Sequence, residues 1–161
     1  MKLHIATTIL LLASLSTLAT FAQTNQAQNP NEGTATESDT QRVRAGQSHS
    51  NNDGVKVENN QGSDGDAYIS PKQGNANSET KVRTRSGFRG KVTGIDKNDT
   101  VEVGSNNDAT VEGDGGKVTV GGGSRVTVTN KATAGGASIE VTLSTGSVIT
   151  VPPGSTVTIQ N

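Results

Sequence analysis

Six carboxylates between Asp96 and Asp114 are the side chains whose spacing most readily suggests chemistry. Two carboxylates that face each other across a cleft hydrolyse glycosidic bonds, but such a cleft must also hold a sugar. Sugars usually stack on aromatic rings, and from Phe88 onward the chain has no tryptophan and no tyrosine. We therefore interpret as solvated turn acids the six residues Asp96, Asp99, Glu102, Asp108, Glu112 and Asp114.

The same acids are candidate calcium ligands. Gly113-Asp114-Gly115-Gly116 resembles one Gly-Asp turn of the calcium-binding β-rolls, in which such turns form an array. A calcium site requires about six to eight oxygen ligands. The turns at 96–99 and 106–108 would therefore have to converge in space. Because one turn is not an array, we predict no metal site and no cofactor.

Nucleophilic catalysis requires a base, and the folded half of the chain offers none. The two histidines are His4 in the leader and His49 in a polar tract, and there is no cysteine. Serine and cysteine nucleophiles therefore lack an imidazole partner, and imidazole- or thiolate-rich zinc sites are excluded. Gly121 to Gly123 precedes neither Lys-Ser/Thr nor a helix, so it is not a phosphate loop. We predict that the protein is not an enzyme and has no catalytic residues.

A basic cluster occupies the stretch between Glu79 and Asp96, in which no acidic residue intervenes. Its members are Lys81, Arg83, Arg85, Arg89 and Lys91. Such a cluster attracts anionic surfaces such as lipopolysaccharide, teichoic acid or DNA. Nucleic-acid grooves, however, interleave aromatic residues, and only Phe88 is present. We favour a solvated boundary between two parts of the chain, keep contact with an anionic surface as the alternative, and expect no nucleic-acid partner.

Residues 1–22 have the features of a secretory signal peptide. Lys2 provides a positive start, Ile5 to Phe21 is uncharged and mostly apolar, and Ala22 supplies a small residue at the cleavage position. The stretch only approaches the roughly 18 to 20 apolar residues of a membrane span. We expect cleavage after Ala22, no transmembrane span in the mature chain, and a periplasmic or extracellular location.

Residues 23–85 are dominated by Gln, Asn, Ser, Gly, Asp and Thr. The sizeable apolar side chains between Gln23 and Thr80 are Val43, Val55, Val57, Tyr68 and Ile69. They are too few to offset the roughly 1 to 2 kcal/mol per residue that backbone ordering costs. We expect a disordered low-complexity spacer, in which Gly54 to Glu58 forms a short strand only if it finds partners.

Residues 86–161 follow the period of two that is typical of β-strands. Turn-forming runs of Gly, Asn, Asp and Pro separate the strands, which begin about every eight to ten residues. We predict an all-β domain, a small antiparallel sandwich or barrel. The alternative is a β-solenoid, which we rank lower because we expect equal coils in a solenoid, and Ala132 to Ala137 interrupts the clearest repeat.

An internal duplication supports the all-β class. Val118 to Val128 reads V-T-V-G-G-G-S-R-V-T-V, and Ile149 to Ile159 reads I-T-V-P-P-G-S-T-V-T-I. The two segments keep the residues that a strand needs and differ mainly in the turn. We interpret them as two copies of a β-hairpin or β-arc.

The same region resembles a known family. The residues that carry the resemblance are Val103-Gly104, Ala109-Thr110-Val111, Gly116 to Val120 and Gly123 to Val128. They are similar to the FecR-type β domain of bacterial envelope proteins, and Ile139 to Ile159 is similar to a second copy of its latter part. The resemblance implies an exported β module of the bacterial envelope. FecR regulators carry a cytoplasmic helical segment and a membrane span, where this chain has a signal peptide and a polar tract.

Residues 141–161 contain no charged side chain. Edge strands are normally protected by charges, bulges or prolines, so these strands lie inside a sheet or pair with another chain. We expect a non-enzymatic exported envelope or cell-surface β module that acts by binding or structure on an unknown protein or envelope polymer. The alternative is a secreted, amyloid-like matrix or adhesion protein that self-associates through residues 141–161.

Overall fold

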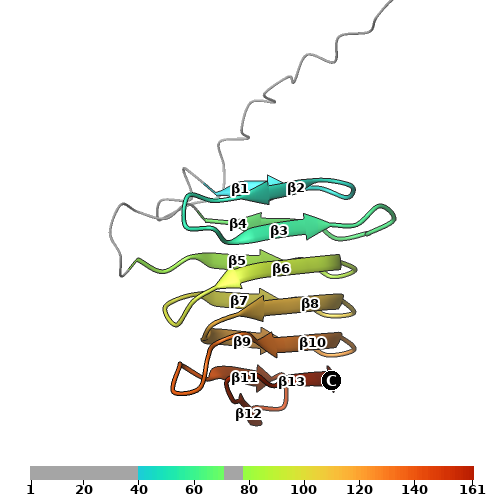
Figure 1. The fold of residues 1–161 in the computed structure, drawn as a ribbon. Helices are drawn as coiled ribbons and strands as arrows, with labels where there is room; N and C mark the ends of the chain where they lie inside the picture. The colour runs from blue at the N-terminus through green and yellow to red at the C-terminus, as the bar shows by residue number, and fades with distance from the viewer. Residues whose placement is uncertain (1–39, 71–77) are drawn as a thin grey trace, which may run out of the picture. The chain divides into compact units, whose positions relative to one another are not determined.

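The computed structural model describes residues 40–70 and 78–161 of the chain. Within these ranges every regular secondary-structure element is a β-strand, and the strands form two mixed sheets (Figure 1). The first sheet has seven strands in the order β1 (Gln41–Val43), β4 (Ala67–Ile69), β5 (Lys81–Thr84), β7 (Thr100–Val103), β9 (Gly116–Val120), β11 (Ile139–Leu143) and β12 (Val148–Val151). The second has six, in the order β13 (Thr156–Gln160), β10 (Arg125–Asn130), β8 (Asp108–Gly113), β6 (Arg89–Ile95), β3 (Lys56–Asn59) and β2 (Ser48–Ser50).

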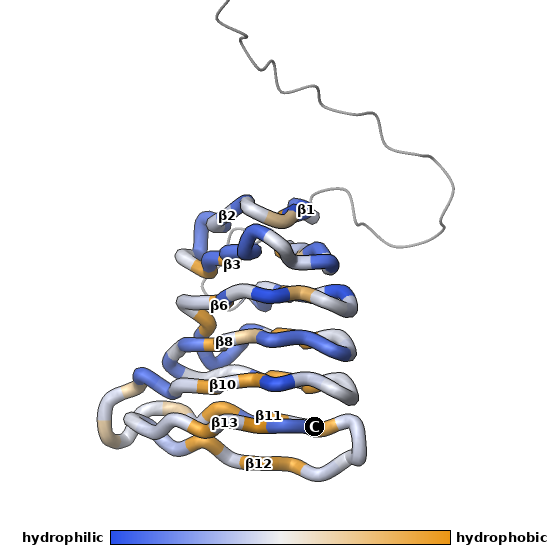
Figure 2. The backbone as a smooth tube through the Cα atoms, turned by 90° about the vertical axis from the view of Figure 1, so that its right-hand side faces the viewer, coloured by the Kyte–Doolittle hydropathy of each residue, from blue (hydrophilic) through white to orange (hydrophobic). Residues whose placement is uncertain are grey.

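The central strands form a β-solenoid. The chain crosses from one sheet to the other between β5 and β6, between β7 and β8, and between β9 and β10. Neighbouring strands β5, β7, β9 and β11 are parallel, as are β6, β8 and β10. Each pass through both sheets is therefore one coil, and Figure 2 shows β6, β8 and β10 stacked one above another. The alternative fold from the sequence is observed, and the favoured antiparallel sandwich or barrel is not.

The turns explain this correction. An antiparallel sandwich needs turns that reverse the chain within one sheet, but Gly121 to Gly123, in the segment interpreted as a hairpin or an arc, joins β9 of one sheet to β10 of the other. Successive strands therefore face each other across the core instead of sharing hydrogen bonds. Ala132 to Ala137, the interruption that counted against a solenoid, lies between β10 and β11. It therefore leaves the parallel register of the paired strands unchanged.

Stacked β-branched side chains fill the space between the two sheets. In the seven-stranded sheet Val101 lies beside Val118, which lies beside Val141. In the six-stranded sheet Val92 lies beside Val111, which lies beside Val128. All six are buried. Because alternate residues of a strand point to opposite faces, each coil places one apolar row inside and one polar row outside.

The duplicated segments are β-arcs. Val118 to Val128 contains β9 and β10, and Ile149 to Ile159 contains β12 and β13. Each arc passes from the seven-stranded sheet to the six-stranded sheet. The second arc runs in the opposite direction, since β12 is antiparallel to β11 and β13 is antiparallel to β10. The C-terminal copy therefore ends the parallel progression of coils.

The expected boundary at residue 86 is wrong for the described part of the spacer. Residues 41–69 form β1 to β4, and the apolar side chains Val43, Val55, Val57 and Ile69 are buried. An isolated segment of this composition could not bury enough apolar surface to fold, but here β3 pairs with β6 and β4 pairs with β5. A strand added to an existing sheet gains hydrogen bonds and a covered face, so few apolar residues are enough. The expected signal peptide, the start of the expected spacer and residues 71–77 lie outside the described residues.

Glycines at one corner allow the coils to approach closely. A Cβ atom on Gly104 would lie 2.6 Å from the carbonyl oxygen of Thr84, and one on Gly121 would lie 2.7 Å from the carbonyl carbon of Gly104. Only a residue without a side chain fits such contacts. At the adjacent Gly122 the nearest atom is the Ser144 hydroxyl oxygen at 3.8 Å, so a methyl group would be accommodated there.

The part of the chain that the structure describes contains no helix long and apolar enough to cross a membrane.

Candidate functional site

Three aspartates come together beside the turn between β6 and β7. One carboxylate oxygen from each of Asp53, Asp96 and Asp99 lies within 4.8 Å of the other two. Asp53 belongs to the turn before β3, whereas the other two flank the β6–β7 turn. Asp99 is buried, and the other two are half-buried. We call these three residues, together with Thr80, the aspartate corner.

Hydrogen bonds join three segments of the chain at the aspartate corner. Oδ1 of Asp99 accepts a bond of 2.9 Å from the backbone N–H of Thr80, and Oδ2 accepts one of 2.8 Å from the N–H of Asp96. The Thr80 hydroxyl accepts from Nδ2 of Asn51 at 2.9 Å and donates to Oδ2 of Asp53 at 3.5 Å. Asp99 therefore fastens the β6–β7 turn to the residue that precedes β5.

Burial raises the pKa of Asp99 above its usual value. The two backbone N–H groups oppose this shift, and the neighbouring carboxylates of Asp96 and Asp53 add to it. Raised carboxylate pKa values occur at functional sites and also in structural networks. Here both oxygens of Asp99 accept backbone hydrogen bonds, and this arrangement is typical of a carboxylate with a structural role.

Asp53, Asp96 and Asp99 are the residues of the described chain that best suit a divalent cation, because hard cations prefer carboxylate oxygens. The turn at 106–108 does not join them. Nδ2 of Asn107 donates to the Thr84 hydroxyl at 2.6 Å, whereas Asp99 contacts Thr80 at the opposite end of β5. The convergence that a calcium cage of about six to eight ligands requires is therefore not found.

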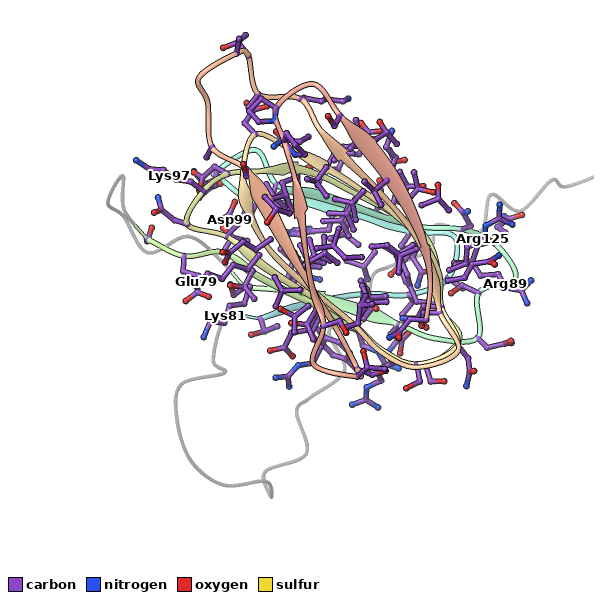
Figure 3. The ribbon with its side chains drawn as sticks, turned by 90° about the horizontal axis from the view of Figure 1, so that it is seen from below. Glu79, Lys81, Arg89, Lys97, Asp99 and Arg125 are labelled. Atoms are coloured by element: carbon purple, nitrogen blue, oxygen red, sulfur yellow. The ribbon has the colours of Figure 1, made fainter. Side chains whose placement is uncertain are left out.

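The five basic residues of the expected anionic-surface contact do not form one surface. Lys81 and Arg83 lie on β5 in the seven-stranded sheet. Arg89 and Lys91 lie on β6 in the six-stranded sheet, with Arg85 in the connection between them. Figure 3 shows Lys81 and Arg89 on opposite sides of the coils. The run of charges in the sequence is thus divided between the two faces.

Most of these basic side chains also have partners. Three form ion pairs with glutamates: Lys81 with Glu79 at 3.6 Å, Arg83 with Glu102 at 2.7 Å, and Lys91 with Glu112 at 2.7 Å. The Arg85 guanidinium lies over the ring of Tyr68, 5.1 Å from its centroid. Cation–π contacts of this kind are attractive. The positive charges are therefore largely balanced within the coils.

Glu112 is the centre of a network with two lysines on the six-stranded sheet. Its Oε1 faces Lys91, and its Oε2 forms an ion pair with Lys131. Hydrogen bonds from Lys131 and then Lys91 lower the pKa of Glu112 below its usual value. Glu112 and Asp96 also line a shallow depression beside the bulge in β6. The acid that we interpreted as a solvated turn residue is a strand residue that binds two cations.

A row of alternating charges that crosses three coils was missed by reasoning from the sequence. Arg89 on β6 lies beside Asp108 on β8, which lies beside Arg125 on β10. Figure 3 shows the two arginines on the same side. The repeat of the coil is the signal that groups them, and it becomes visible only once the parallel register is known.

Asp53 and Thr80 were also missed, because both were placed in the disordered spacer. A signal for Asp53 existed in Asn51-Asn52-Asp53-Gly54, a turn sequence just before the alternating V-K-V of β3. The N–H groups of Asp53 and Val55 both bond to Oδ1 of Asn51. Nothing in the sequence indicated that Thr80 would meet Asp99.

The C-terminal strands form an uncharged end of the stack. Val148 on β12 is 61% exposed and is the exposed large apolar residue of the described chain. Leu143, Ile149 and Val157 pack against the core but remain partly exposed. Figure 2 shows more apolar colour on β11, β12 and β13 than on β2 and β3. No described strand pairs with the outer edges of β12 and β13.

No family model matches this chain, and comparisons with curated proteins and with solved structures found no match.

Proposed function

We propose that this chain is a non-enzymatic β module of the bacterial envelope or cell surface that is exported and acts through structure or binding. One observation carries the proposal: three of the six acids that the sequence offered for chemistry hold strands and turns together. Asp99 fastens a turn, while Glu102 and Glu112 pair with basic side chains on neighbouring strands. Charge networks of this kind suit a coil stack whose outer faces are presented as a scaffold.

Export rests on residues outside the described ranges. Lys2, the apolar stretch from Ile5 to Phe21, and Ala22 form the expected signal peptide. The similarity of the β region to the FecR-type β domain supports the same location. A coil stack with polar outer faces is suited to contact a protein or polymer of the envelope over a long surface.

Expression of the full chain in a bacterial host with a fractionation assay tests this proposal. The chain should be recovered from the periplasm, the cell surface or the medium, with Gln23 as its first residue by mass spectrometry. Ala22→Arg should block cleavage, because signal peptidase needs a small residue there. The matched variant Ala27→Arg should still be processed. An uncleaved wild-type chain in the cytoplasm would contradict the proposal.

The second candidate function is self-assembly into a secreted matrix. The uncharged edges of β12 and β13 favour it, since exposed strand edges without charges pair readily with other chains. In this case the purified chain should form species that sediment and grow with time. A soluble chain whose mass stays constant would contradict the matrix function, and the envelope module would be the remaining candidate.

A further inference from the structure

The two sheets do not end at the same level of the stack. Beyond β9 the seven-stranded sheet continues through β11 to β12, whereas beyond β10 the six-stranded sheet ends at β13. Nδ2 of Asn161, just after β13, donates to the Val120 carbonyl at 2.8 Å and to the Ser144 hydroxyl at 3.0 Å, so β13 lies opposite β11. β12 thus has no described strand opposite it, and Figure 1 shows it as the last level.

The outer edge of β13 presents backbone groups for pairing. In an antiparallel pair, residues alternate between those that bond the partner strand and those whose N–H and C=O point away from it. The N–H of Asn161 donates to the Ser124 carbonyl at 3.0 Å, which makes this a bonded pair. By the register of β10 with β13, Thr156 and Thr158 then direct their N–H and C=O groups to the outer edge.

The outer edge of β12 is equivalent. The N–H of Leu143 donates to the Ser147 carbonyl at 2.9 Å, and this pair continues the register of β11 with β12. Val148 and Thr150 therefore direct their backbone groups away from β11. Both strands end the stack with unpaired donors and acceptors.

The vacant level opposite β12 is apolar and uncharged. Ile149 on β12 and Val157 on β13 are partly exposed next to the core, and residues 141–161 have no charged side chain. The opposite end of the stack differs, because β1 carries Arg42 and β2 carries His49. Two copies that meet through β12 and β13 therefore bring no like-charged side chains of these strands together.

We infer that a second copy of this chain fills the vacant level, with β12 of each copy paired to β13 of the other. β12 and β13 run in opposite directions, since each is antiparallel to its neighbour and the coils reverse direction between sheets. Rotation about a twofold axis parallel to the strands leaves the strand directions unchanged and exchanges the positions of the two sheets. β12 of each copy therefore lies antiparallel to β13 of the other. The seven strands of one copy then continue into the six of the other, in both sheets.

Other arrangements leave the core open. A twofold axis perpendicular to the sheets would pair β12 with β12 of the other copy, but two strand positions would stay empty between the two β13 strands. At this end the seven-stranded sheet extends one level, β12, beyond the six-stranded sheet, and this shape is thus complementary to the same end of a second copy. Two copies satisfy the contact completely, so the assembly is a closed dimer. The inference deepens the self-association considered above, but it predicts a dimer in place of a growing fibre.

Sedimentation velocity of the purified full chain over a range of concentrations tests the dimer. The chain should sediment as two copies without larger species. Thr158→Pro removes an outward N–H and no backbone hydrogen bond to β10, although it also loses the 3.3 Å bond between the Thr158 and Thr127 hydroxyls. Proline is tolerated on an edge strand. It should raise the dissociation constant of the dimer about tenfold or more, because it removes one hydrogen bond from each of two symmetric seams. Circular dichroism should show that the variant is folded.

The matched control is Ser48→Pro, which removes an outward N–H from the edge strand β2 at the other end of the stack. Its dimer should be unchanged. Hydrogen exchange gives a readout that needs no variant: the amides of Thr156 and Thr158 should exchange more slowly as the concentration rises. A monomer at all concentrations, fibres, or a dimer that Thr158→Pro leaves intact would overturn the inference. Fibres would favour the matrix function, whereas a monomer would leave the exported module unaffected.

Discussion

The carboxylate of Asp99 accepts a hydrogen bond of 2.9 Å from the backbone N–H of Thr80, across a sequence interval that contains all of β5 and β6. The bond ties together two turns that the sequence alone assigned to different domains. It also holds a carboxylate that is 1% exposed beside two others, and this environment determines how the stability of the fold responds to pH.

Asp99 should make the fold more stable in acid than at neutral pH. Its folded-state pKa is raised above the ordinary value of 3.8, so the folded state binds a proton more tightly than the unfolded state. The free energy of unfolding should therefore fall as pH rises from below 3.8 through the folded-state pKa. Urea unfolding of the parent and Asp99→Asn across this range measures the effect.

The difference in the free energy of unfolding between the parent and Asp99→Asn should decrease as pH rises. Asp99→Asn removes the titration, so its destabilisation relative to the parent should be larger in acid than at neutral pH. It should remain destabilising throughout by about 1 to 3 kcal/mol, because an amide nitrogen replaces one of two buried acceptors. A difference that grows with rising pH would show that the carboxylate is stabilised as an anion.

Glu112 should respond to pH with the opposite sign. Hydrogen bonds from Lys131 and Lys91 lower its folded-state pKa below 4.5, so its stabilisation is present above 4.5 and is lost as pH falls through the folded-state pKa. Glu112→Gln should lower the free energy of unfolding by about 1 kcal/mol at neutral pH, and this difference should vanish in acid. Glu102→Gln is the control, because Glu102 is more exposed, at 47% against 15%, and should cost less.

The alternation of the strands is tested by a pair of neighbours on β9. Val120 is buried, whereas the adjacent Thr119 is exposed. Val120→Asp should unfold the chain, since an unpaired buried charge costs several kcal/mol and a domain has about 5 to 15 kcal/mol of stability. Thr119→Asp should melt within a few degrees of the parent by circular dichroism. Val151→Asp on β12 should also unfold the chain, and equal melting of all three variants would mean that the strand faces are assigned wrongly.

The start of the folded unit is tested by truncation. A chain that begins at Thr40 should unfold cooperatively on heating, because it keeps β1 to β4. A chain that begins at Ser86 should not, because it lacks β1 to β5 and exposes the edges of β6 and β7. Circular dichroism with thermal melting distinguishes them. Cooperative folding of the shorter chain would restore the boundary at residue 86.

Corner packing is tested by two adjacent glycines. Gly121→Ala should destabilise the fold by about 1 to 3 kcal/mol, as overpacked sites do, because the methyl group would lie 2.7 Å from the backbone of Gly104. Gly122→Ala should be nearly neutral, since the nearest atom is 3.8 Å away. Equal melting temperatures for the two variants would argue against close stacking of the coils at this corner.

The sequence was sufficient for the strand class of residues 86–161 but not for its architecture. Period-two valines such as Val118 and Val120 predict strands in either fold, because an inward side chain is buried in a sandwich and in a solenoid alike. The duplicated segment was correctly interpreted as a hairpin or an arc, and only the structure distinguishes the two. Whether a turn closes a hairpin or a corner depends on which strand lies beside the next, and this is a long-range property.

Most of the candidate site could not be predicted from the sequence, because it too depends on which strands lie side by side. Asp96 and Asp99 were recognised as turn acids, but Asp53 and Thr80 reach them only through the stacking of strands. The basic run was read as one cluster because its members are close in sequence. The chain crosses from one sheet to the other within that run, and this separates Lys81 from Arg89.

The register of the coils also sets how a gene of this kind can change in length. Thr100 lies beside Lys117 and Asp108 beside Arg125, an offset of 17 residues in both sheets. An in-frame insertion of one such unit between Gly104 and Gly121 would add a complete level and leave both ends of the stack as they are. An insertion of one residue within a strand would instead turn the following side chains of that strand to the wrong face, unless a bulge like the one in β6 absorbed it. Recombination that adds or removes a whole coil therefore preserves the stacking of strands, whereas a single-codon insertion within a strand disturbs it.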